Sequence, residues 1–574
     1  MITDLAVLII VLIVITLVLY GWGALVLLAL GIGERTQLTT LIVWLGFCTV
    51  LSFVEIAHVL VPIDWRASLL ATVVGATGAV LAKQSLSGWS LTCVWAHIRA
   101  RPFSVFLGGI FVAVSCLRAM ELPTLYDSGL YHFGSIRWLN EAPIALGLGN
   151  VHWRLALNQS YFGFLALLNF SPFWGKGYAT GGLFLLLLTA VTLFEIARYQ
   201  SNLWRTIFIG FLFPYFFLLS IGISNPTPDT AVALVEIALF LFAFSLFSSE
   251  RLSRHQCEGL QLCILFLCFS VITIKLSSLA YSLVFASLII VHRWRQRQPS
   301  PMFLHKLMIA VALLGIFHFL RSYLLSGAPL FPSPIGGLWS LPWAVQPGVA
   351  SFESQLIYAW ARQPGIASPA LLQSSFGWLP AWFHSLPQTT VILFVLASVL
   401  TAINLTLFGK YRSFGQLGVK ALYLPLIVSL GFWFFTAPDP RFLGAILVVY
   451  AAFSIWFFLA YIEWLQQTNG KHPVIWVHVL PSLVGCIALA VLIKLGVLNI
   501  NLNHGWPVLP QAELKIQSSL QGVEVFVPTE GAQCWNAPLP CAIGVHPGLQ
   551  ATSTSSFKYI DGTNTNRLMF SIRE

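Results

Sequence analysis

The chain has 574 residues, of which 57% are apolar and only 9% are charged. An ordinary soluble protein carries about 25% charged residues, so a soluble globule of this length could not cover its surface with so few. The mean hydropathy of +0.83 agrees. These values predict a polytopic membrane protein and exclude a soluble enzyme, a disordered chain and a collagen-like chain.

The net charge of +10 does not indicate a nucleic-acid partner. The excess Lys and Arg lie in short loops between apolar stretches, which is the placement that membrane orientation requires. No basic cluster is interleaved with exposed aromatic residues in a soluble region. Membrane lipids are therefore the expected surroundings, and no nucleic acid is expected to bind.

Apolar windows of roughly 16–25 residues recur along the chain, and each is long enough for a membrane helix. We expect an all-α membrane protein with about fourteen such helices, near residues 5–31, 39–61, 67–83, 103–119, 178–197, 206–223, 230–248, 258–274, 276–292, 307–322, 389–408, 417–436, 441–463 and 474–497. The first window lacks a positive n-region, so we interpret it as a membrane helix rather than a cleaved signal. The stretch 258–292 is too long for one crossing, and we divide it at Lys275.

The loops predict the orientation of the chain. One set of loops contains Arg35, Lys83, Arg99, Arg101, Arg198, Arg205, Arg251, Arg254, Arg293, Arg295, Arg297, Lys306, Lys410, Arg412, Lys420 and Lys471. The short loops of the other face contain little more than Arg66, Lys275 and Arg441. By the positive-inside rule the first set is cytoplasmic, so both termini lie outside a cytoplasmic (inner) membrane that the chain crosses many times.

Three regions without the helical pattern fall on the outer face, and they suggest three domains. Residues 1–102 are N-terminal membrane helices, and residues 103–497 are a membrane core with outer loops at 120–177 and 323–388. Residues 498–574 form a small extracytoplasmic C-terminal domain. This domain is expected to be β-rich, because Val523 to Val527 alternates as a strand does.

Seven of the nine cysteines lie in or beside apolar stretches and are interpreted as small core residues. The other two, Cys534 and Cys541, lie in the tail, where the predicted orientation allows thiols to oxidise. We predict that they form a disulfide; two free thiols are the alternative. Zinc is not expected, because the spacing is wrong and no nearby Cys pair completes a tetrad.

Aspartate is rare in this chain, which makes each one informative, since a charge beside a membrane helix costs free energy and usually has a function. Asp127, Asp229 and Asp439 fall at the outer ends of different predicted helices. No comparable acidic set lies on the cytoplasmic side. We expect these three residues to converge on one outward-facing cavity.

The densest polar stretch is the first outer loop, over residues 126–141 and 152–161. It contains Tyr131, His132, Arg137 and Arg154 beside Asp127. Carboxylates and amides bind sugar hydroxyls, aromatic rings cover sugar faces, and Arg binds phosphate. The alternative is a helix lying in the membrane interface with Asp127 as its N-cap.

Two further clusters have both a functional and a structural interpretation. Residues 224–230, with Asp229, suit a ligand site, or a turn followed by a helix cap. Lys275 lies alone between two short helices, where it would hold a phosphate or extend to lipid headgroups.

Two clusters follow later in the chain. Arg321 and Tyr323 end a predicted helix at the start of the second outer loop. Asp439 and Arg441 share a tight Pro-containing turn, in which they would bind a ligand or pair with each other.

These residues resemble the GT-C superfamily of membrane glycosyltransferases. The resemblance depends on three places: Tyr-Asp-Ser-Gly-Leu-Tyr-His around Asp127, Arg-Ser-Tyr-Leu-Leu-Ser-Gly-Ala-Pro-Leu-Phe-Pro from Arg321, and Pro-Asp-Pro-Arg-Phe around Asp439. The layout of residues 103–497 adds to it, and the similarity is greatest to little-characterised bacterial members.

The resemblance implies an inverting transferase that takes a sugar from a lipid-linked, polyprenyl-phosphate donor. The acceptor would be an unidentified glycan, lipid or protein at the outer face of the membrane. Asp127 would act as general base or bind the acceptor, and Arg321, Arg441 and Lys275 would meet the phosphate charge. We expect Asp127, Arg321, Arg441 and His132 to share one cavity. The sequence requires no cofactor and leaves a divalent metal open.

Two other functions stay open. An O-antigen-type polysaccharide polymerase or ligase would share this outer-face chemistry. A transporter or flippase of a lipid-linked sugar should show repeated halves and broken helices at the midplane. The sequence contains no such repeat.

Overall fold

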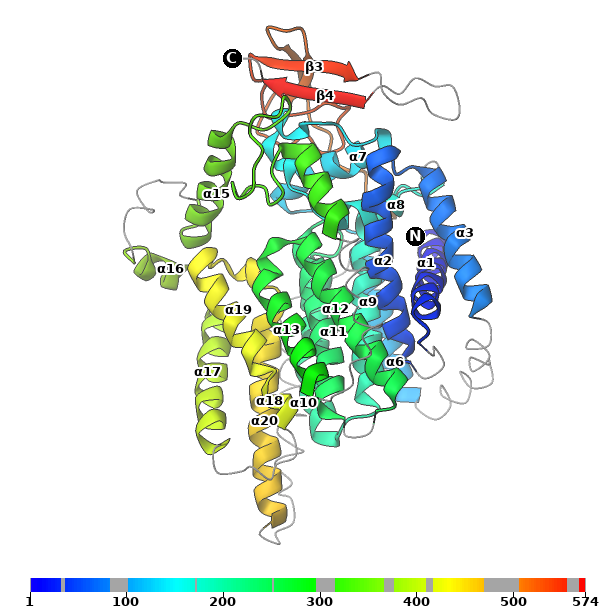
Figure 1. Cartoon of the computed structure of the whole chain (residues 1–574), viewed down its shortest axis with the longest axis vertical. Coiled ribbons are helices and arrows are strands. Elements are labelled where there is room, and N and C mark those ends of the chain that lie inside the picture. Colours follow the sequence, from blue (N-terminus) through cyan, green and yellow to red (C-terminus); the bar gives the residue numbers. More distant parts are fainter. Residues whose placement is uncertain are drawn as a thin grey trace.

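The computed structural model describes residues 2–32, 37–82, 102–170, 173–249, 252–295, 315–365, 376–408, 417–468, 505–554 and 567–572. It is a bundle of long helices with two small β-sheets at one end (Figure 1). We call this end, where β1 to β4 lie, the strand end of the bundle.

Ten helices of the described ranges are long and apolar enough to cross a membrane, if two short turns are counted with the helices that follow them. They are α1 (Ile2–Leu30), α2 (Thr39–Leu60), α9 (Gly177–Ala197), α10 (Asn202–Ile221), α11 (Pro228–Ser248), α12 (Arg254–Ile274), η5 (Leu276–Ser278) with α13 (Leu279–Arg295), α17 (Gln388–Phe408), α18 (Leu417–Lys420) with α19 (Tyr423–Thr436), and α20 (Ile446–Thr468). Two shorter apolar helices are α3 (Trp65–Leu81) and α6 (Pro102–Ala119).

These helices correspond to twelve of the fourteen predicted from the sequence. The predicted helix 307–322 is described only from residue 315, within a helix over 315–326. The predicted helix 474–497 lies outside the described residues. The predicted break at Lys275 is confirmed: α12 ends at Ile274, and α13 begins after the η5 turn.

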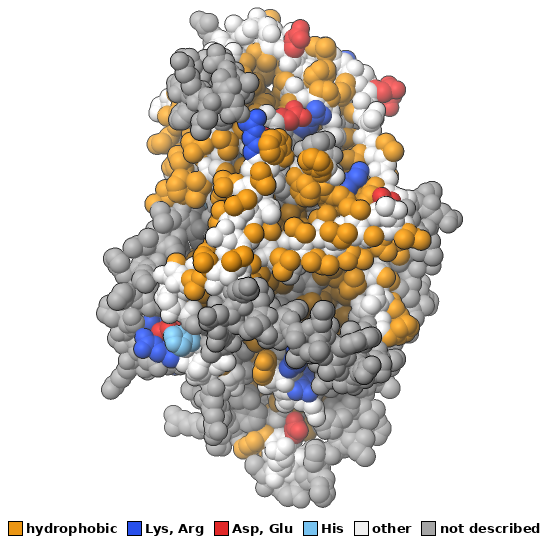
Figure 2. Space-filling view, turned by 90° about the vertical axis from the view of Figure 1, so that its right-hand side faces the viewer, with side chains coloured by type: hydrophobic (Ala, Val, Ile, Leu, Met, Phe, Trp, Pro, Cys, Tyr) orange, Lys and Arg blue, Asp and Glu red, His pale blue; other side chains and the backbone are white. Residues whose placement is uncertain are grey.

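The first three helices pack with their backbones in contact, which only glycine permits. A Cβ atom on Gly21 of α1 would lie 1.7 Å from the Gly75 carbonyl oxygen of α3, and one on Gly46 of α2 would lie 1.7 Å from the Leu19 carbonyl oxygen. Small residues allow this close approach between membrane helices. Figure 2 shows the face on which α1 and α3 lie, where hydrophobic side chains cover the middle and charged ones lie toward the ends.

The first predicted outer loop folds into five short helices, η2 (Ser128–His132), α7 (Phe133–Glu141), η3 (Leu148–Asn150), η4 (Trp153–Ala156) and α8 (Ser160–Leu167). Tyr131, Ile136 and Leu139 of these helices are buried. Every residue of α8 is buried, because this helix is almost wholly apolar and packs against α2.

The second predicted outer loop contains α15 (Pro347–Arg362) and α16 (Leu379–Ser385). The short helix η7 (Pro440–Leu443) forms the predicted turn between α19 and α20.

The C-terminal region forms two antiparallel pairs of strands. β1 (Leu514–Ser518) pairs with β2 (Glu524–Pro528), and β3 (Leu549–Thr554) pairs with β4 (Arg567–Ile572). The predicted β structure near residue 525 is thus confirmed. The main chain of Phe570 donates to the Leu146 carbonyl at 2.8 Å, and Leu146 donates to the Leu568 carbonyl at 2.9 Å, so β4 is tied directly to the loop before η3.

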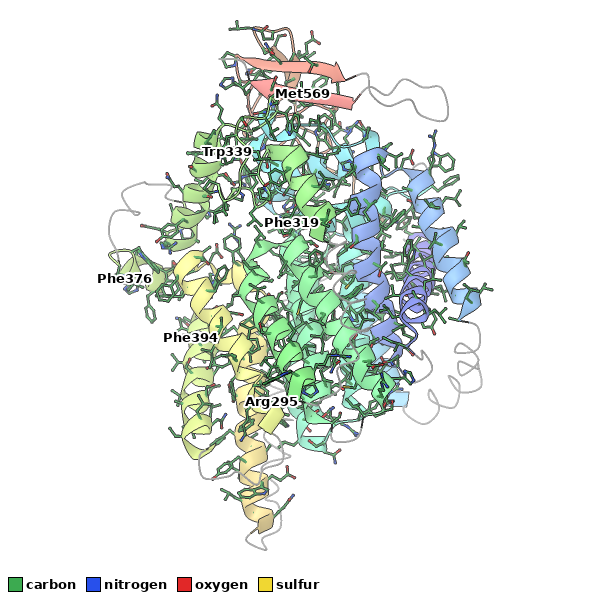
Figure 3. The ribbon with its side chains drawn as sticks, in the orientation of Figure 1. Arg295, Phe319, Trp339, Phe376, Phe394 and Met569 are labelled. Atoms are coloured by element: carbon green, nitrogen blue, oxygen red, sulfur yellow. A yellow bond between two sulfur atoms is a disulfide. The ribbon has the colours of Figure 1, made fainter. Side chains whose placement is uncertain are left out.

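The two ends of the bundle differ in charge. Arg198, Arg205, Arg254, Arg293 and Arg295 of the predicted cytoplasmic set lie at helix ends away from the strands. Figure 3 shows Arg295 toward this opposite end, with Trp339 and Met569 at the strand end.

Candidate functional site

A cavity of about 310 Å³ opens near the strand end of the bundle, and seven separate segments of the chain form it. We call it the Asp127 cavity. Its polar lining residues are Asp127, Tyr131, His132, Arg154, Asn158, Gln159, Thr227, Asp229, Lys275, Ser277, Glu353, Thr436 and Arg441. Its apolar lining residues are Leu157, Pro228, Ile272, Leu276, Phe331, Pro332, Ile357, Phe432, Trp433, Ala437 and Phe442.

Asp127 lies between two arginines from distant parts of the chain. Its Oδ1 is 3.0 Å from Nη1 of Arg154, and its Oδ2 is 3.8 Å from Nη1 of Arg441. The alternative that Asp127 caps a helix fails, because its side chain makes no capping hydrogen bond to η2. The carboxylate is therefore held by cations and lines the cavity, with 31% of its side chain exposed.

A second ion pair joins Lys275 and Asp229 on the same cavity wall. The Lys275 Nζ atom also lies 4.1 Å from the centre of the Phe442 ring, and the Arg441 guanidinium lies 4.7 Å from it. Cations are attracted to aromatic faces, so Phe442 holds both cations beside the cavity. Lys275 therefore pairs within the protein.

Local sequence explains how these segments are positioned. Thr227 caps α11 by accepting from the Asp229 amide, and Pro228 suits the first helical position. This cap places Asp229 in the first turn of α11. The capping alternative thus applies to Thr227, and the Asp229 carboxylate stays available for Lys275.

Asn225 fixes the approach of the chain to Asp127. Its Oδ1 accepts from the amides of Thr124 and Leu125, both at 2.8 Å, and from the Ser128 hydroxyl at 3.2 Å. Asn225 is buried, and three donors on one amide oxygen make it a strong anchor. The sequence gives Asn225 no role of its own within the 224–230 cluster, because an Asn before Pro is also an ordinary turn residue.

The short π-helix η2 brings Tyr131 and His132 to the cavity. Burial, and then the charges of Lys275 and Arg154, lower the pKa of His132 to about 3. Burial and then Asp127 raise the pKa of Tyr131. Both side chains are therefore neutral near pH 7, and Nδ1 of His132 has no hydrogen-bond partner among the described residues.

Glu353 of α15 is a cavity residue that the sequence did not indicate. Its carboxylate lies 3.3 Å from Nε of Arg154 and accepts from the Trp153 indole at 2.7 Å. Only 2% of the side chain is exposed, and this burial raises the pKa of Glu353. One signal was available: Glu353 is the only acid of α15, and it falls on the buried face of an amphipathic helix.

Seven of the residues singled out from the sequence line the Asp127 cavity. They are Asp127, Tyr131, His132, Arg154, Asp229, Lys275 and Arg441. Four others do not line it. Tyr323 donates to the Gly336 carbonyl at 2.7 Å within its own loop, and Asp439 accepts from the Arg441 amide at 2.9 Å and pairs with Nε of Arg441 at 3.1 Å. The predicted Asp439–Arg441 pair thus forms, while Arg441 also reaches Asp127.

Arg321 lies behind the cavity wall. It donates to Oδ1 of Asn158, which lines the cavity, and its Nε lies 3.4 Å from Nδ1 of His58 on α2. The expectation that Arg321 lines the cavity was wrong, because the polar residues of α2 turn it toward that helix. Beside it His318 pairs with Glu55 at 2.7 Å, so a buried polar cluster supports Asn158 from behind.

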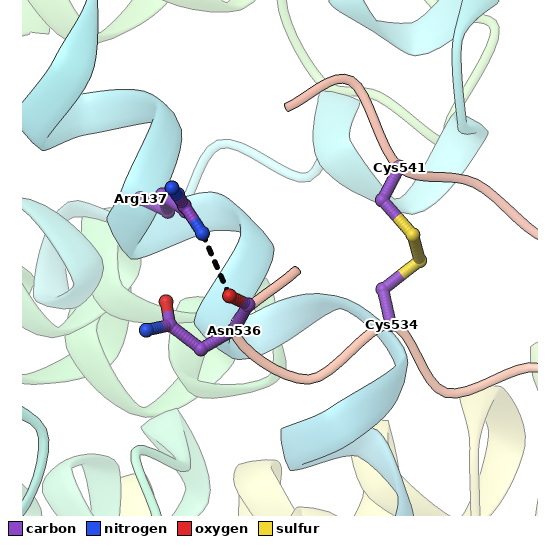
Figure 4. Close-up of a disulfide and its surroundings, with 4 residues drawn as sticks. All are labelled: Arg137, Cys534, Asn536 and Cys541. Carbon is purple, nitrogen blue, oxygen red and sulfur yellow. Dashed lines mark hydrogen bonds between the residues drawn. A yellow bond between two sulfur atoms is a disulfide. The ribbon is translucent and has the colours of Figure 1, made fainter. Parts of the chain in front are cut away.

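Arg137 points to the other side of its helix. Its guanidinium pairs with Glu141 at 2.5 Å and donates to the Asn536 carbonyl at 2.7 Å, next to the predicted disulfide between Cys534 and Cys541, which is present (Figure 4). Across the described ranges, no group of three or more His, Cys, Asp or Glu residues is arranged to hold a metal ion.

The chain belongs to the family described as Domain of unknown function (DUF8201), whose model matches residues 5–448, well over half of its length. No curated protein and no solved structure matches the chain.

Proposed function

We propose that this protein is an integral-membrane glycosyltransferase of the GT-C type. It transfers a sugar from a lipid-linked, polyprenyl-phosphate donor to an acceptor at the outer face of the cytoplasmic membrane. One observation carries the proposal: seven residues that the sequence marks as candidate sugar and phosphate ligands come from distant segments and line a single cavity.

The make-up of the cavity suits a lipid phosphate. Arg154, Lys275 and Arg441 supply three cations, and eleven of the lining residues are apolar, Leu157, Ile272 and Phe432 among them. An amphipathic cavity of this kind can accept a charged headgroup together with the start of a hydrocarbon chain.

Every cation of the cavity is already held by a carboxylate. Asp127, Asp229 and Glu353 pair with these cations from the cavity lining, and Asp439 pairs with Arg441 from outside it. An arriving phosphate would share these cations, and Arg441 is the most accessible, with 44% of its side chain exposed. Cations that are fixed before the ligand arrives stabilise a leaving phosphate without further reorganisation.

Asp127 is the base in this mechanism. The acceptor hydroxyl gives its proton to the Asp127 carboxylate, and its oxygen forms the new bond to the anomeric carbon of the sugar. The bond from that carbon to the phosphate oxygen breaks, and the lipid phosphate leaves with the electron pair. His132 is neutral, and its free nitrogen can accept a hydrogen bond from a sugar hydroxyl.

The position of the cavity favours an enzyme over a transporter. Asp229 begins α11 and Lys275 follows α12, so both lie at helix ends. A transporter would place its substrate site near the middle of the membrane. The predicted orientation turns this end of the bundle outward, where lipid-linked sugars enter from the outer leaflet.

The test is a transfer assay with the full chain in lipid vesicles. A panel of radiolabelled polyprenyl-phosphate sugars is offered together with a membrane extract from cells that lack the gene, in which the unused acceptor accumulates. Transfer of label by the wild type, and its loss in Asp127→Asn, supports the proposal. No transfer from any donor, with unchanged lipid-linked sugars in the deletion strain, would refute it.

A further inference from the structure

A second cavity of about 340 Å³ lies at the strand end and shares no lining residue with the Asp127 cavity. We call it the α7 cavity. It lies between α7, the start of α3, the start of α9 and the C-terminal region. The lining residues that matter here are Trp65, Arg137, Glu141, Asn169, Tyr178 and Asn536.

The hydroxyl of Tyr178 is the first sign of a ligand. Tyr178 is 4% exposed, and its hydroxyl is a buried polar atom without a hydrogen-bond partner among the described residues. Buried polar groups in folded proteins nearly always have a partner, so an unpaired one at a cavity wall calls for an explanation. A ligand hydroxyl would supply the missing hydrogen bond.

The other lining groups match a ligand rich in hydroxyls. Asp64 and Glu141 are acceptors, the Asn536 side chain is exposed, and Asn169 keeps its amide oxygen while its NH2 group donates to Asn140 at 2.9 Å. Trp65, 48% exposed, presents an aromatic ring of the kind that covers sugar faces. A few polar groups among aromatic rings is the usual make-up of a specific small-molecule site.

The charge of the α7 cavity argues against an anionic ligand. Arg137 is its only Lys or Arg among the described residues, and Asp64 and Glu141 outnumber it. Moreover, Arg137 already pairs with Glu141 at 2.5 Å and donates to the Asn536 carbonyl at 2.7 Å (Figure 4). Arg66, which is not a lining residue, lies 3.9 Å from Asp64. An anionic ligand would therefore compete with Asp64 and Glu141 for cations that these carboxylates already hold.

We propose that the α7 cavity binds an uncharged saccharide. The two cavities lie against consecutive parts of one helical segment: His132 lines the Asp127 cavity, and Phe133 lines the α7 cavity. A saccharide in the α7 cavity is thus held beside the segment that carries Asp127. The inference depends on the geometry of this cavity alone, so it holds whether or not the protein transfers sugars.

Saturation-transfer NMR on the full chain in nanodiscs tests the proposal. The probes are methyl hexopyranosides, maltose and lactose, with glucuronic acid and glucose 6-phosphate as anionic counterparts, each at about 10 mM, which detects weak binding. We expect a signal from at least one neutral probe. Any signal from the anionic probes should come from the cations of the Asp127 cavity, and it should stay unchanged when Trp65 and Asn536 are both replaced by alanine. Tyr178→Phe removes one hydroxyl and should weaken binding roughly fivefold, the effect of one hydrogen bond.

A second variant keeps the test clear of folding defects. Trp65→Ala combined with Asn536→Ala changes two exposed side chains and should abolish the signal. Trp294→Ala and Tyr199→Phe change exposed aromatic residues away from the α7 cavity, and they should leave the signal unchanged.

Three results would overturn the proposal: no signal from any neutral probe, loss of an anionic-probe signal in the Trp65 and Asn536 double variant, or full binding of the neutral probes by that variant.

Discussion

Ion pairs with two arginines hold Asp127 in place, and they determine the expected effect of substituting it. Arg154 and Arg441 approach it from opposite oxygens, at 3.0 and 3.8 Å. An asparagine in its place keeps an oxygen that can accept from Arg154 and removes only the charge and the basicity. The substitution therefore separates chemistry from folding.

Asp127→Asn should lower sugar transfer by about a hundredfold or more, the usual effect of losing a positioned base. Insertion into the membrane and the thermal unfolding midpoint should change little. Transfer by the purified variant in vesicles is the measurement. An Asn variant with full activity would move the catalytic assignment to Asp229.

His132 predicts a dependence of stability on pH. Its pKa is about 3 in the folded chain, against about 6.5 in the unfolded chain. Between these values the unfolded chain binds a proton that the folded chain does not. His132 therefore costs stability as the pH falls from 6.5 toward 3, by at most about 1.4 kcal/mol per pH unit.

His132→Gln removes the imidazole that binds this proton in the unfolded chain, and it keeps a polar side chain. The variant should lose less stability than the wild type between pH 6.5 and 4, as followed by tryptophan fluorescence during thermal unfolding. His384→Gln changes an exposed histidine and serves as the control. If stability falls with pH equally in the wild type and in His132→Gln, His132 is not buried in its neutral form.

The sequence indicated lining residues of the Asp127 cavity where a residue type is rare. Asp127 and Asp229 stand out in a chain with 9% charged residues, and a costly charge usually has a function. Glu353 and Asn225 did not stand out, because their importance comes from partners more than a hundred positions away in the chain, Arg154 and Thr124. A single sequence does not contain such pairings.

At the scale of elements, the length and hydropathy of the apolar stretches were enough to predict most of the helices. The predicted ranges 39–61 and 389–408 differ from α2 (Thr39–Leu60) and α17 (Gln388–Phe408) by one residue at one end. The π-turn η2 could not be predicted, because it has no periodicity of its own and depends on the contacts around it. The burial of α8 follows from packing against α2, which an apolar stretch of eight residues does not reveal.

The backbone contact between α1 and α3 makes a prediction about glycine. Gly21→Ala places a methyl group 1.7 Å from the Gly75 carbonyl oxygen, so the helices must separate. We expect a loss of about 1–3 kcal/mol, the cost of overpacking, and a lower thermal unfolding midpoint in detergent.

Gly108 of α6 is the matched control, because a Cβ atom there meets nothing within 4 Å. Gly108→Ala should be neutral or slightly stabilising, since alanine favours helices more than glycine does. Equal destabilisation by the two substitutions would mean that α1 and α3 are not in close contact.

At the scale of the whole molecule, the C-terminal region holds the loop that carries Asp127. The side chain of Gln533 donates to the Tyr126 carbonyl at 2.9 Å, and the amide of Trp535 donates to the Gly129 carbonyl at 2.8 Å. These two bonds bracket Asp127. Both donors lie at the Cys534–Cys541 disulfide, so the disulfide orders the tail segment that positions the site.

Replacing Cys534 and Cys541 by serine should therefore reduce sugar transfer more than it reduces overall stability. The bond spans a sequence separation of 7, for which the chain-entropy relation gives about 2 kcal/mol, confined to the C-terminal region. Transfer activity and protease sensitivity of the tail are the measurements, and Cys257→Ser is the control at a cysteine outside the disulfide. A double variant with a protected tail and full activity would contradict this coupling.

The orientation of the whole molecule follows from the separation of charge between its ends. Arg254 and Arg295 lie at one end, whereas the disulfide and both cavities lie at the other. By the positive-inside rule we expect the first end to be cytoplasmic and the second end to lie outside the membrane, where a disulfide persists. An impermeant maleimide on intact cells should then label Cys534 and Cys541 only after reduction. The buried cysteines Cys48, Cys116, Cys263 and Cys268 should stay protected in the folded chain.

A cysteine introduced at the 81% exposed Trp294, near Arg295, should react only after the cells are permeabilised. Labelling of Trp294→Cys from outside, with the tail unreachable, would reverse the orientation and remove the outer-leaflet donor from the proposed reaction.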